Sequence, residues 1–234
     1  MLTAIQTLHL EGLANLTASV HNLTLGASML SLRGLYAITD AALIPAEHLH
    51  TAVTQALIGG AQLIQYRDKT HDASKRRQQA QALHQCCQQY QCPLIINDDI
   101  HLAQDIQAEG VHLGQADADI TMARRLLGAQ AIIGISCHNR LDLAQQACAA
   151  GASYVAFGRF FPSQTKPQAV AADIALLSEA KKLITQPIVA IGGITPDNGA
   201  QLIAAGADCL AVIHGLFAAE DICATARQYA QLFH

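Results

Sequence analysis

The sequence has no tryptophan, and only 14% of its 234 residues are charged. Fourteen lysines and arginines stand against 18 acidic residues, which gives a net charge of −4. This balance argues against general binding to nucleic acid or to an anionic membrane surface, because both need a basic face. No apolar run reaches the ~18 residues of a membrane span. An anionic ligand must therefore be held by a local cluster of cations.

The cysteines lack the spacings that indicate a structural role. There are seven, they are scattered along the chain, and no C-x-x-C pair occurs. Neither a disulfide framework nor a zinc site is expected from this pattern. The N-terminus has no basic segment followed by an apolar block, so no secretory signal is expected. Together these features predict a cytoplasmic protein with reduced thiols.

Short apolar runs alternate with helical stretches along most of the chain. Helical periodicity appears at 46–58, 74–90, 140–149 and 196–205. Eight strand–helix repeats over about 200 residues predict an α/β protein with a single (β/α)₈ barrel, the TIM-barrel architecture. An open doubly wound sheet is the alternative, but no G-x-G-x-x-G segment follows the first run. The eight runs begin near Leu35, Gln62, Pro93, Val111, Ile132, Ser153, Pro187 and Asp208.

The first 30 residues differ from the rest. Residues 1–30 mix apolar, threonine, asparagine and histidine residues without a clear period, which predicts an N-terminal extension that is helical or disordered. No linker or change in composition follows, so 31–234 is predicted to form one catalytic barrel domain. The sequence leaves the oligomeric state open, and a homo-oligomer is one of the possibilities.

The second apolar run ends in the segment 65–69, where it turns abruptly into charge. In a strand, alternate residues share a face, so Gln65, Arg67 and Lys69 are expected to point the same way. An amide, a guanidinium and an ammonium then project together from one strand end. In a chain with so few cations, this arrangement predicts a phosphate ligand.

Other predicted strand ends carry polar or glycine-rich segments, and the carboxyl ends of barrel strands meet at one mouth. Each segment also has a purely structural interpretation as a helix cap, an ordinary loop or a tight turn. Taken together, two strand-end carboxylates beside a phosphate site suit Mg²⁺, and hydroxyls followed by a lysine suit a phosphate. These segments are Asn97-Asp98-Asp99, Gly114-Gln115-Ala116-Asp117, Ser136-Cys137-His138, Pro162-Ser163-Gln164-Thr165-Lys166, Gly192-Gly193-Ile194 and Ile213-His214-Gly215.

The histidines and cysteines give little sign of acid–base or nucleophilic catalysis. His112 falls inside the fourth run and is interpreted as a hydrogen-bonded core histidine. Cys137 is interpreted as a small packing residue. Five other histidines are predicted to lie at the surface, namely His48, His50, His71, His84 and His101.

The sequence resembles the thiamine phosphate synthase family. The resemblance rests on seven segments in order, and it extends from about Leu35 to Leu232. These segments are Q-Y-R-D-K (65–69), N-D-D (97–99), G-Q-A-D (114–117), G-I-S (134–136), P-S-Q-T-K (162–166), G-G-I (192–194) and I-H (213–214).

The resemblance implies a Mg²⁺-dependent transferase of thiamine biosynthesis. Such an enzyme joins a hydroxymethylpyrimidine diphosphate to a hydroxyethylthiazole phosphate and releases pyrophosphate. The catalytic residues implied are Arg67, Lys69, Ser136 and Lys166. The pyrimidine diphosphate is implied to bind Gln65, Tyr66, Arg67, Asp68, Lys69, Asn97, Ser136 and Lys166. The thiazole phosphate is implied to bind Ser163, Gln164, Thr165, Gly193, Ile213 and His214, and one Mg²⁺ ion to bind Asp98 and Asp117.

The chain departs from the family pattern at a few positions. Ser163 and His214 stand where threonine and serine are common, Arg159 stands where proline is common, and the loop after Lys166 looks short. A thiazole tautomerase of the same superfamily, which typically lacks the full diphosphate and metal set, is one alternative. A non-catalytic, phosphate-binding regulatory barrel is another. A phosphate-handling isomerase would need an acid–base pair, which the sequence does not offer.

Overall fold

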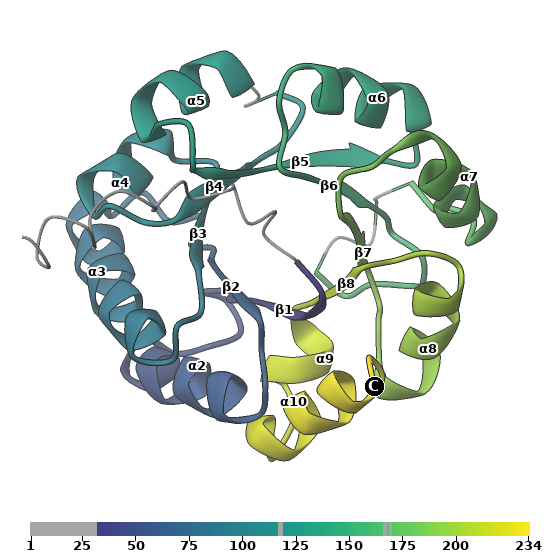
Figure 1. Ribbon diagram of the computed structural model, residues 1–234. Coiled ribbons are helices and arrows are strands. Elements are labelled where there is room, and N and C mark those ends of the chain that lie inside the picture. Colours follow the sequence, from purple (N-terminus) through teal and green to yellow (C-terminus); the bar gives the residue numbers. More distant parts are fainter. Residues whose placement is uncertain (1–31, 117–118, 166–167, 169) are drawn as a thin grey trace, which may run out of the picture. The chain divides into compact units, whose positions relative to one another are not determined.

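The computed structural model describes residues 32–116, 119–165, 168 and 170–234. Eight parallel strands pair in chain order and close into a barrel, with β8 beside β1. Figure 1 shows helices forming a ring around this barrel. The (β/α)₈ prediction is therefore confirmed. The predicted extension, 1–30, lies outside the described residues, so its conformation and its boundary with the barrel stay predictions.

All eight predicted strands are present. They are β1 (Gly34–Ile38), β2 (Leu63–Tyr66), β3 (Leu94–Asn97), β4 (Gly110–Leu113), β5 (Ile132–His138), β6 (Tyr154–Phe157), β7 (Ile188–Ile191) and β8 (Cys209–Val212). The helices are η1 (Ala46–His48), α2 (Leu49–Ile58), α3 (Ala73–Gln89), α4 (Ile100–Asp105), α5 (Ile120–Leu127), α6 (Leu141–Ala149), α7 (Ala175–Leu183), α8 (Pro196–Ala204), α9 (His214–Phe217) and α10 (Ile222–Gln231). Among the residues described, no helix is long and apolar enough to cross a membrane.

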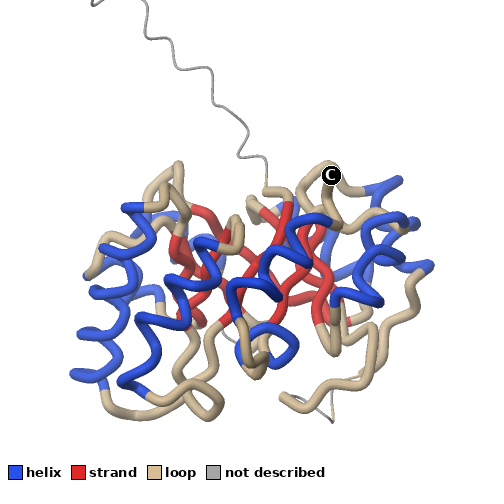
Figure 2. The backbone as a smooth tube through the Cα atoms, turned by 90° about the horizontal axis from the view of Figure 1, so that it is seen from below, coloured by secondary structure: helices blue, strands red, loops and turns tan. Residues whose placement is uncertain are grey.

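The strands are buried on both faces, which explains their nearly continuous apolar runs. In β1, Leu35 and Ala37 belong to the layer between strands and helices, while Tyr36 and Ile38 belong to the layer inside the barrel. Figure 2 shows the strands enclosed by helices. Full burial of a side chain such as Leu35 stabilises the fold by about 1.5–3 kcal/mol.

Four helices have an aspartate as their N-cap residue. A carboxylate that caps a helix is already hydrogen-bonded and is less available to a ligand. Asp72 and Asp221 accept hydrogen bonds from backbone amides at the starts of α3 and α10. Asp99 does the same for α4, and Asp119 for α5. The capping residue of the Asn97-Asp98-Asp99 segment is therefore Asp99, which leaves Asp98 at the strand end.

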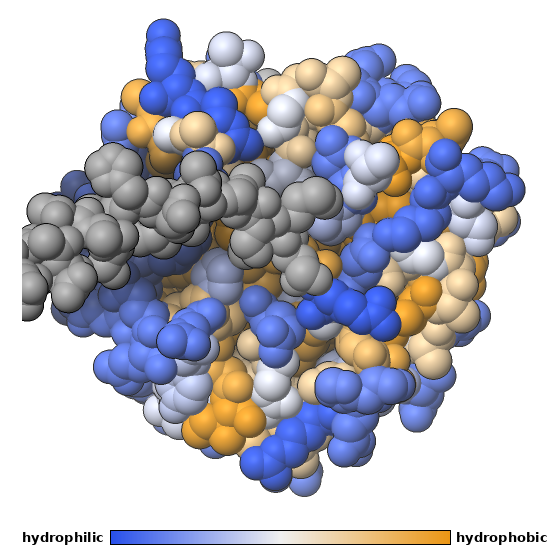
Figure 3. Space-filling view, in the orientation of Figure 1, coloured by the Kyte–Doolittle hydropathy of each residue, from blue (hydrophilic) through white to orange (hydrophobic). Residues whose placement is uncertain are grey.

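The predicted surface histidines are exposed with one exception. His84 is buried, with its Nε2 atom 3.1 Å from Oε1 of Glu109. The surface prediction was wrong for His84 because it lies on the same buried face of α3 as Ala80, Leu83 and Cys87. On the face shown in Figure 3, hydrophilic side chains spread widely around the periphery, and hydrophobic ones lie in smaller patches between them.

Candidate active site

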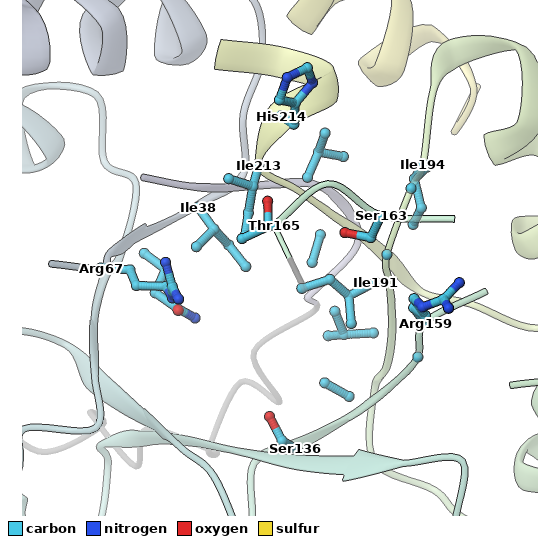
Figure 4. A pocket seen from close by; sticks show the side chains of 18 of the residues that line it. Ile38, Arg67, Ser136, Arg159, Ser163, Thr165, Ile191, Ile194, Ile213 and His214 are labelled. Atoms are coloured by element: carbon cyan, nitrogen blue, oxygen red, sulfur yellow. The ribbon is translucent and has the colours of Figure 1, made fainter. Parts of the chain in front are cut away.

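A cavity of about 870 Å³ is lined by residues from the carboxyl ends of the barrel strands and the loops that follow them. Figure 4 shows Arg67 on one side of this cavity and Ser163 with Arg159 on the opposite side. Ser136 points in from a third direction, from β5. Isoleucine side chains, including Ile38 and Ile191, lie between these polar groups. The cavity thus has separate polar regions around an apolar centre.

The end of β2 supplies the cationic side of the cavity. Gln65, Arg67 and Lys69 all line it, as their period-two spacing predicts. The Nη1 atom of Arg67 donates a hydrogen bond of 2.7 Å to Oδ2 of Asp40, and its backbone amide donates to Oγ1 of Thr39 over 2.9 Å. Residues that follow β1 therefore hold the guanidinium in place.

Tyr66 and Asp68 are not brought into the cavity. The hydroxyl of Tyr66 donates to Oε1 of Gln79 on α3 over 2.9 Å. Asp68 accepts a hydrogen bond of 2.7 Å from the amide of Thr70 and lies 3.1 Å from the ammonium of Lys75. Burial raises the pKa of Asp68, but these hydrogen bonds and the Lys75 charge outweigh it and hold the pKa below its ordinary range. Both side chains secure the β2–α3 connection.

Asp98 places a carboxylate at the same mouth. Its φ of 62° is uncommon for a residue other than glycine and is best tolerated by aspartate and asparagine. Asn97 Nδ2 donates to Oδ2 of Asp98 over 2.6 Å, and Lys69 forms an ion pair with the same oxygen. Asp117 lies outside the described residues. Among the residues that are described, no group of three or more His, Cys, Asp and Glu side chains could hold a metal ion.

The polar floor of the cavity contains Ser136 and His112. The Oγ atom of Ser136 lies 2.8 Å from Nε2 of His112, and Nδ1 of His112 lies 3.0 Å from the hydroxyl of Tyr154. His112 is thus hydrogen-bonded, as predicted, but it also lines the cavity. Cys137 is buried, and burial raises the pKa of its thiol to about 12, which agrees with a packing role.

The loop after β6 and the loop after β7 form the side opposite Arg67. Ser163, Gln164 and Thr165 line the cavity there, while Lys166 lies outside the described residues. Gly193 has a φ of 65°, and a Cβ atom on it would lie 2.3 Å from the carbonyl oxygen of Pro162. Only glycine allows this close approach of the two loops.

The end of β8 completes this side. Ile213 and His214 both line the cavity, and Figure 4 shows the imidazole of His214 at the rim, directed away from the centre. The hydroxyl of Tyr229, on α10, donates a hydrogen bond of 2.9 Å to the carbonyl oxygen of Ile194. A C-terminal helix therefore anchors the loop that follows β7.

Several residues of the site carry no motif that could be recognised in the sequence. Tyr36, Tyr154 and Tyr229 belong to apolar or helical stretches, where a tyrosine is usually a core residue. Asp40 follows the first strand without any pattern around it. The pairing of β1 with β2, in which Ile38 lies opposite Gln65, is the only signal that could have brought Asp40 and Arg67 together.

The chain is similar to proteins of known activity. The sequence profile of the thiamine monophosphate synthase family matches residues 35–216. A thiamine-phosphate synthase of Nitrosococcus oceani is 59% identical over 203 residues, which cover 87% of this chain and 94% of that protein. One from Saccharophagus degradans is 57% identical over 80% of this chain and 87% of its own. The structure of thiamine phosphate pyrophosphorylase from Pyrococcus furiosus superposes with a TM-score of 0.78 at 30% identity, covering 87% of this chain and 96% of that one.

Proposed function

Because the chain belongs to the thiamine monophosphate synthase family, we propose that the cavity of its barrel holds the two phosphorylated substrates of that reaction on opposite sides. The enzyme is a transferase that joins a hydroxymethylpyrimidine diphosphate to a hydroxyethylthiazole phosphate and releases pyrophosphate. The observation that supports two separate substrate positions is that an apolar centre separates two polar regions of the cavity. Arg67 and Lys69 lie on one side, and hydroxyls with a glycine turn and Arg159 lie on the other.

The pyrimidine diphosphate belongs on the β2 side of the cavity. Arg67 and Lys69 would face the diphosphate, Gln65 and Asn97 would bind beside them, and Ser136 would reach the leaving group from β5. Lys166 is proposed to add a further cation, although it lies outside the described residues. Tyr66 and Asp68 contact α3, and no substrate contact is proposed for them.

The thiazole phosphate belongs on the opposite side. Ser163, Gln164 and Thr165 offer hydroxyl and amide groups, and the turn at Gly193 allows a phosphate to approach the backbone. Ile213 and His214 would contact the phosphate through their backbone amides, which fits an imidazole directed away from the centre.

We also propose that one Mg²⁺ ion binds at the mouth of the cavity. Asp98 lines the cavity beside Lys69, and Asp117 is the proposed second ligand, outside the described residues. Mg²⁺ is commonly held by one or two carboxylates together with substrate phosphate oxygens. When bound there, it would neutralise part of the charge on the diphosphate.

The reaction needs charge neutralisation more than proton transfer. The bond between the pyrimidine methylene carbon and the diphosphate oxygen breaks, and its electron pair leaves with the diphosphate. The electron-rich aminopyrimidine ring stabilises the resulting cation until the lone pair of the thiazole nitrogen forms the new carbon–nitrogen bond. That nitrogen carries no proton, so no general base is required. Arg67 and Lys69 would stabilise the leaving charge, and the apolar walls formed by Ile38, Val189 and Ile191 would exclude water from the cation.

Pyrophosphate release tests the proposal. The full chain is mixed with both substrates and Mg²⁺, with single-substrate and EDTA controls. Release is expected only when both substrates and the metal are present. A protein that binds the diphosphate but releases no pyrophosphate would instead be the regulatory barrel.

A matched pair of variants locates the diphosphate. In Arg67→Ala, kcat is expected to fall about a hundredfold or more, with thiazole phosphate binding changed by less than about twofold. Arg77→Ala is the control, because it removes an arginine from an exposed pair with Asp105. Equal turnover of the two variants would exclude the diphosphate from the β2 side.

We propose a reducing, cytoplasmic setting as well. All seven cysteines are free thiols in the structure, and most are buried, among them Cys86, Cys87 and Cys92. Thiol labelling of the protein purified without reductant tests this, and recovery of a disulfide-linked form would contradict it.

A further inference from the structure

Five polar side chains form a continuous hydrogen-bonded chain through the interior of the barrel, and all of them except Tyr154 also line the cavity. The Nε2 atom of Gln65 donates to the hydroxyl of Tyr36 over 2.6 Å, and this hydroxyl lies 2.8 Å from that of Tyr154. The chain continues over 3.0 Å to Nδ1 of His112 and from its Nε2 over 2.8 Å to Oγ of Ser136. Residues from β1, β2, β4, β5 and β6 are thereby connected.

The polarity of this interior is not needed to fill the barrel. Tyr36, Gln65 and Tyr154 are 1%, 2% and 0% exposed, and apolar side chains such as Leu63 and Val189 belong to the same interior cluster as the two tyrosines. Burying hydroxyl and amide groups costs free energy unless they are hydrogen-bonded, and phenylalanine would fill the tyrosine positions equally well. The hydrogen bonds therefore call for an explanation beyond packing.

The rings are held in one arrangement. Tyr36 meets Tyr154 edge to face, with centroids 5.9 Å apart at 86°. The imidazole of His112 stacks on Tyr154, with centroids 5.6 Å apart at 20°. Gly134 makes room for this arrangement, because a Cβ atom on it would lie 2.0 Å from Cζ of Tyr154.

With a neutral His112, the hydrogen atoms of this chain can all point from Gln65 toward Ser136 or all point the opposite way. Burial raises the pKa of Tyr36 and of Tyr154 well above the ordinary value, so each keeps its one hydroxyl proton. If the Gln65 amide donates, each hydroxyl donates to the next group, and a neutral His112 accepts at Nδ1 and donates from Nε2. The Ser136 proton then remains available to the cavity. In the reverse order, Ser136 donates to His112 and shows only lone pairs to a ligand.

We propose that the chain is ordered from Gln65 to Ser136, and that Tyr36, Tyr154 and His112 are positioning residues which make Ser136 a hydrogen-bond donor to the departing diphosphate. The proposal rests on the proposed function, which places the diphosphate beside Ser136. The reverse order would set oxygen lone pairs against a polyanion, which is unfavourable. No proton is transferred, because the departing oxygen only gains a preorganised donor as the carbon–oxygen bond breaks. Aligned hydrogen bonds also polarise one another in a site of low dielectric.

The tautomer of His112 tests the order directly. Nitrogen-15 NMR of the full, ligand-free chain labelled at histidine is expected to show the neutral Nε2–H form for His112, assigned by its loss in His112→Asn. A tautomer mixture is expected in Tyr154→Phe, because Nδ1 then loses the Tyr154 hydrogen bond. A wild-type Nδ1–H form, or an imidazolium at pH 7.5, would overturn the proposal.

A double-mutant cycle tests the consequence for turnover. Ser136→Ala is expected to lower kcat about a hundredfold and Tyr154→Phe about tenfold, with the KM for thiazole phosphate unchanged. The double variant should match Ser136→Ala, because the chain then has no group to orient. Independent, multiplying losses would mean that Tyr154 acts only on the general structure and would overturn the proposal.

A surface tyrosine provides the control. Tyr90→Phe removes a hydroxyl from a residue that is 41% exposed, and its kcat is expected to equal that of the wild type. The tautomer does not depend on turnover. A wild-type protein with Nε2–H His112 and no pyrophosphate release would therefore contradict the proposed function while supporting the order of the chain.

Discussion

Arg67 donates a hydrogen bond of 2.7 Å from Nη1 to Oδ2 of Asp40, and each side chain is only 14% exposed. The other carboxylate oxygen of Asp40 accepts from the amide of Ala42 over 2.9 Å, which fixes the carboxylate relative to the backbone. The two residues face each other because β1 and β2 are parallel neighbours in the register Ile38 to Gln65. Asp40 therefore holds a cation that would otherwise sample many rotamers.

Replacing Asp40 by asparagine should impair use of the diphosphate substrate. In Asp40→Asn we expect kcat/KM for the pyrimidine diphosphate to fall about tenfold, or about 1.4 kcal/mol, which is within the range of a charged hydrogen bond. Steady-state pyrophosphate release measures this. Asp105→Asn is the control, because its pair with Arg77 lies on the exterior and its loss should leave kcat/KM unchanged. Equal values for the two variants would show that Arg67 needs no support.

Asp98 and Asp99 are adjacent, yet replacing Asp98 should affect activity and replacing Asp99 should affect stability. Asparagine tolerates the φ of 62° at position 98, so Asp98→Asn should leave the free energy of unfolding unchanged. It should raise the Mg²⁺ concentration needed for half-maximal activity and lower kcat. Asp99→Ala removes the cap of α4 and the 2.7 Å ion pair of Asp99 with Arg76, and it should cost about 1–2 kcal/mol of stability, with the Mg²⁺ titration unchanged. An unchanged titration in Asp98→Asn would exclude that carboxylate as a ligand.

The sequence predicts the fold well because a parallel barrel has a strong local signature. Each strand is buried on both faces, so it appears as a short apolar run between helical stretches. The error at His84 arose from a weak signal: its helix, α3, is polar overall, and its buried face includes only a few residues such as Ala80 and Leu83. Burial of a histidine on such a face depends on which strand packs against it, and local sequence does not show this.

The site could be predicted only in part. Gln65, Arg67 and Lys69 share one side because alternation in a strand is a local property. The family resemblance implied that Tyr66 and Asp68 bind the pyrimidine diphosphate, whereas in the structure both side chains contact α3. The contact of Asp40 with Arg67 depends on the register of β1 against β2, and the contact of Tyr36 with Tyr154 crosses the interior of the closed barrel from β1 to β6. Both depend on how separate segments come together, which the sequence of either segment does not show.

Asp68 should make stability depend on pH in the acid range. Its pKa in the folded protein lies below the ordinary value of about 3.9. Its stabilising contribution is therefore fully present above the unfolded pKa, and it is lost as pH falls through the lower, folded value. We expect Asp68→Asn to be less stable than the wild type by about 1–2 kcal/mol at pH 7. The difference should shrink below about pH 4. Urea unfolding at pH 7 and pH 3 measures it, and an equal difference at both values would contradict the prediction.

Tyr229 should control the affinity for thiazole phosphate from outside the cavity. Its hydroxyl, on α10, donates to the carbonyl oxygen of Ile194 over 2.9 Å and lies 3.4 Å from that of Gly215. A Cβ atom at position 215 would lie 2.7 Å from this hydroxyl and 2.5 Å from the Ile194 oxygen, so the loops after β7 and β8 meet at the tyrosine.

Tyr229→Phe removes the hydroxyl that connects the two loops but keeps the buried aromatic ring. We expect the KM for thiazole phosphate to rise about fivefold to tenfold, equivalent to about 1–1.4 kcal/mol, with kcat nearly unchanged. Steady-state kinetics with varied thiazole phosphate measures this. Ser178→Ala is the matched control, because it removes a hydroxyl that donates to the carbonyl oxygen of Ala205 over 3.0 Å, away from the cavity. If Tyr229→Phe lowered only the free energy of unfolding, as the control should, Tyr229 would serve the fold and not the phosphate site.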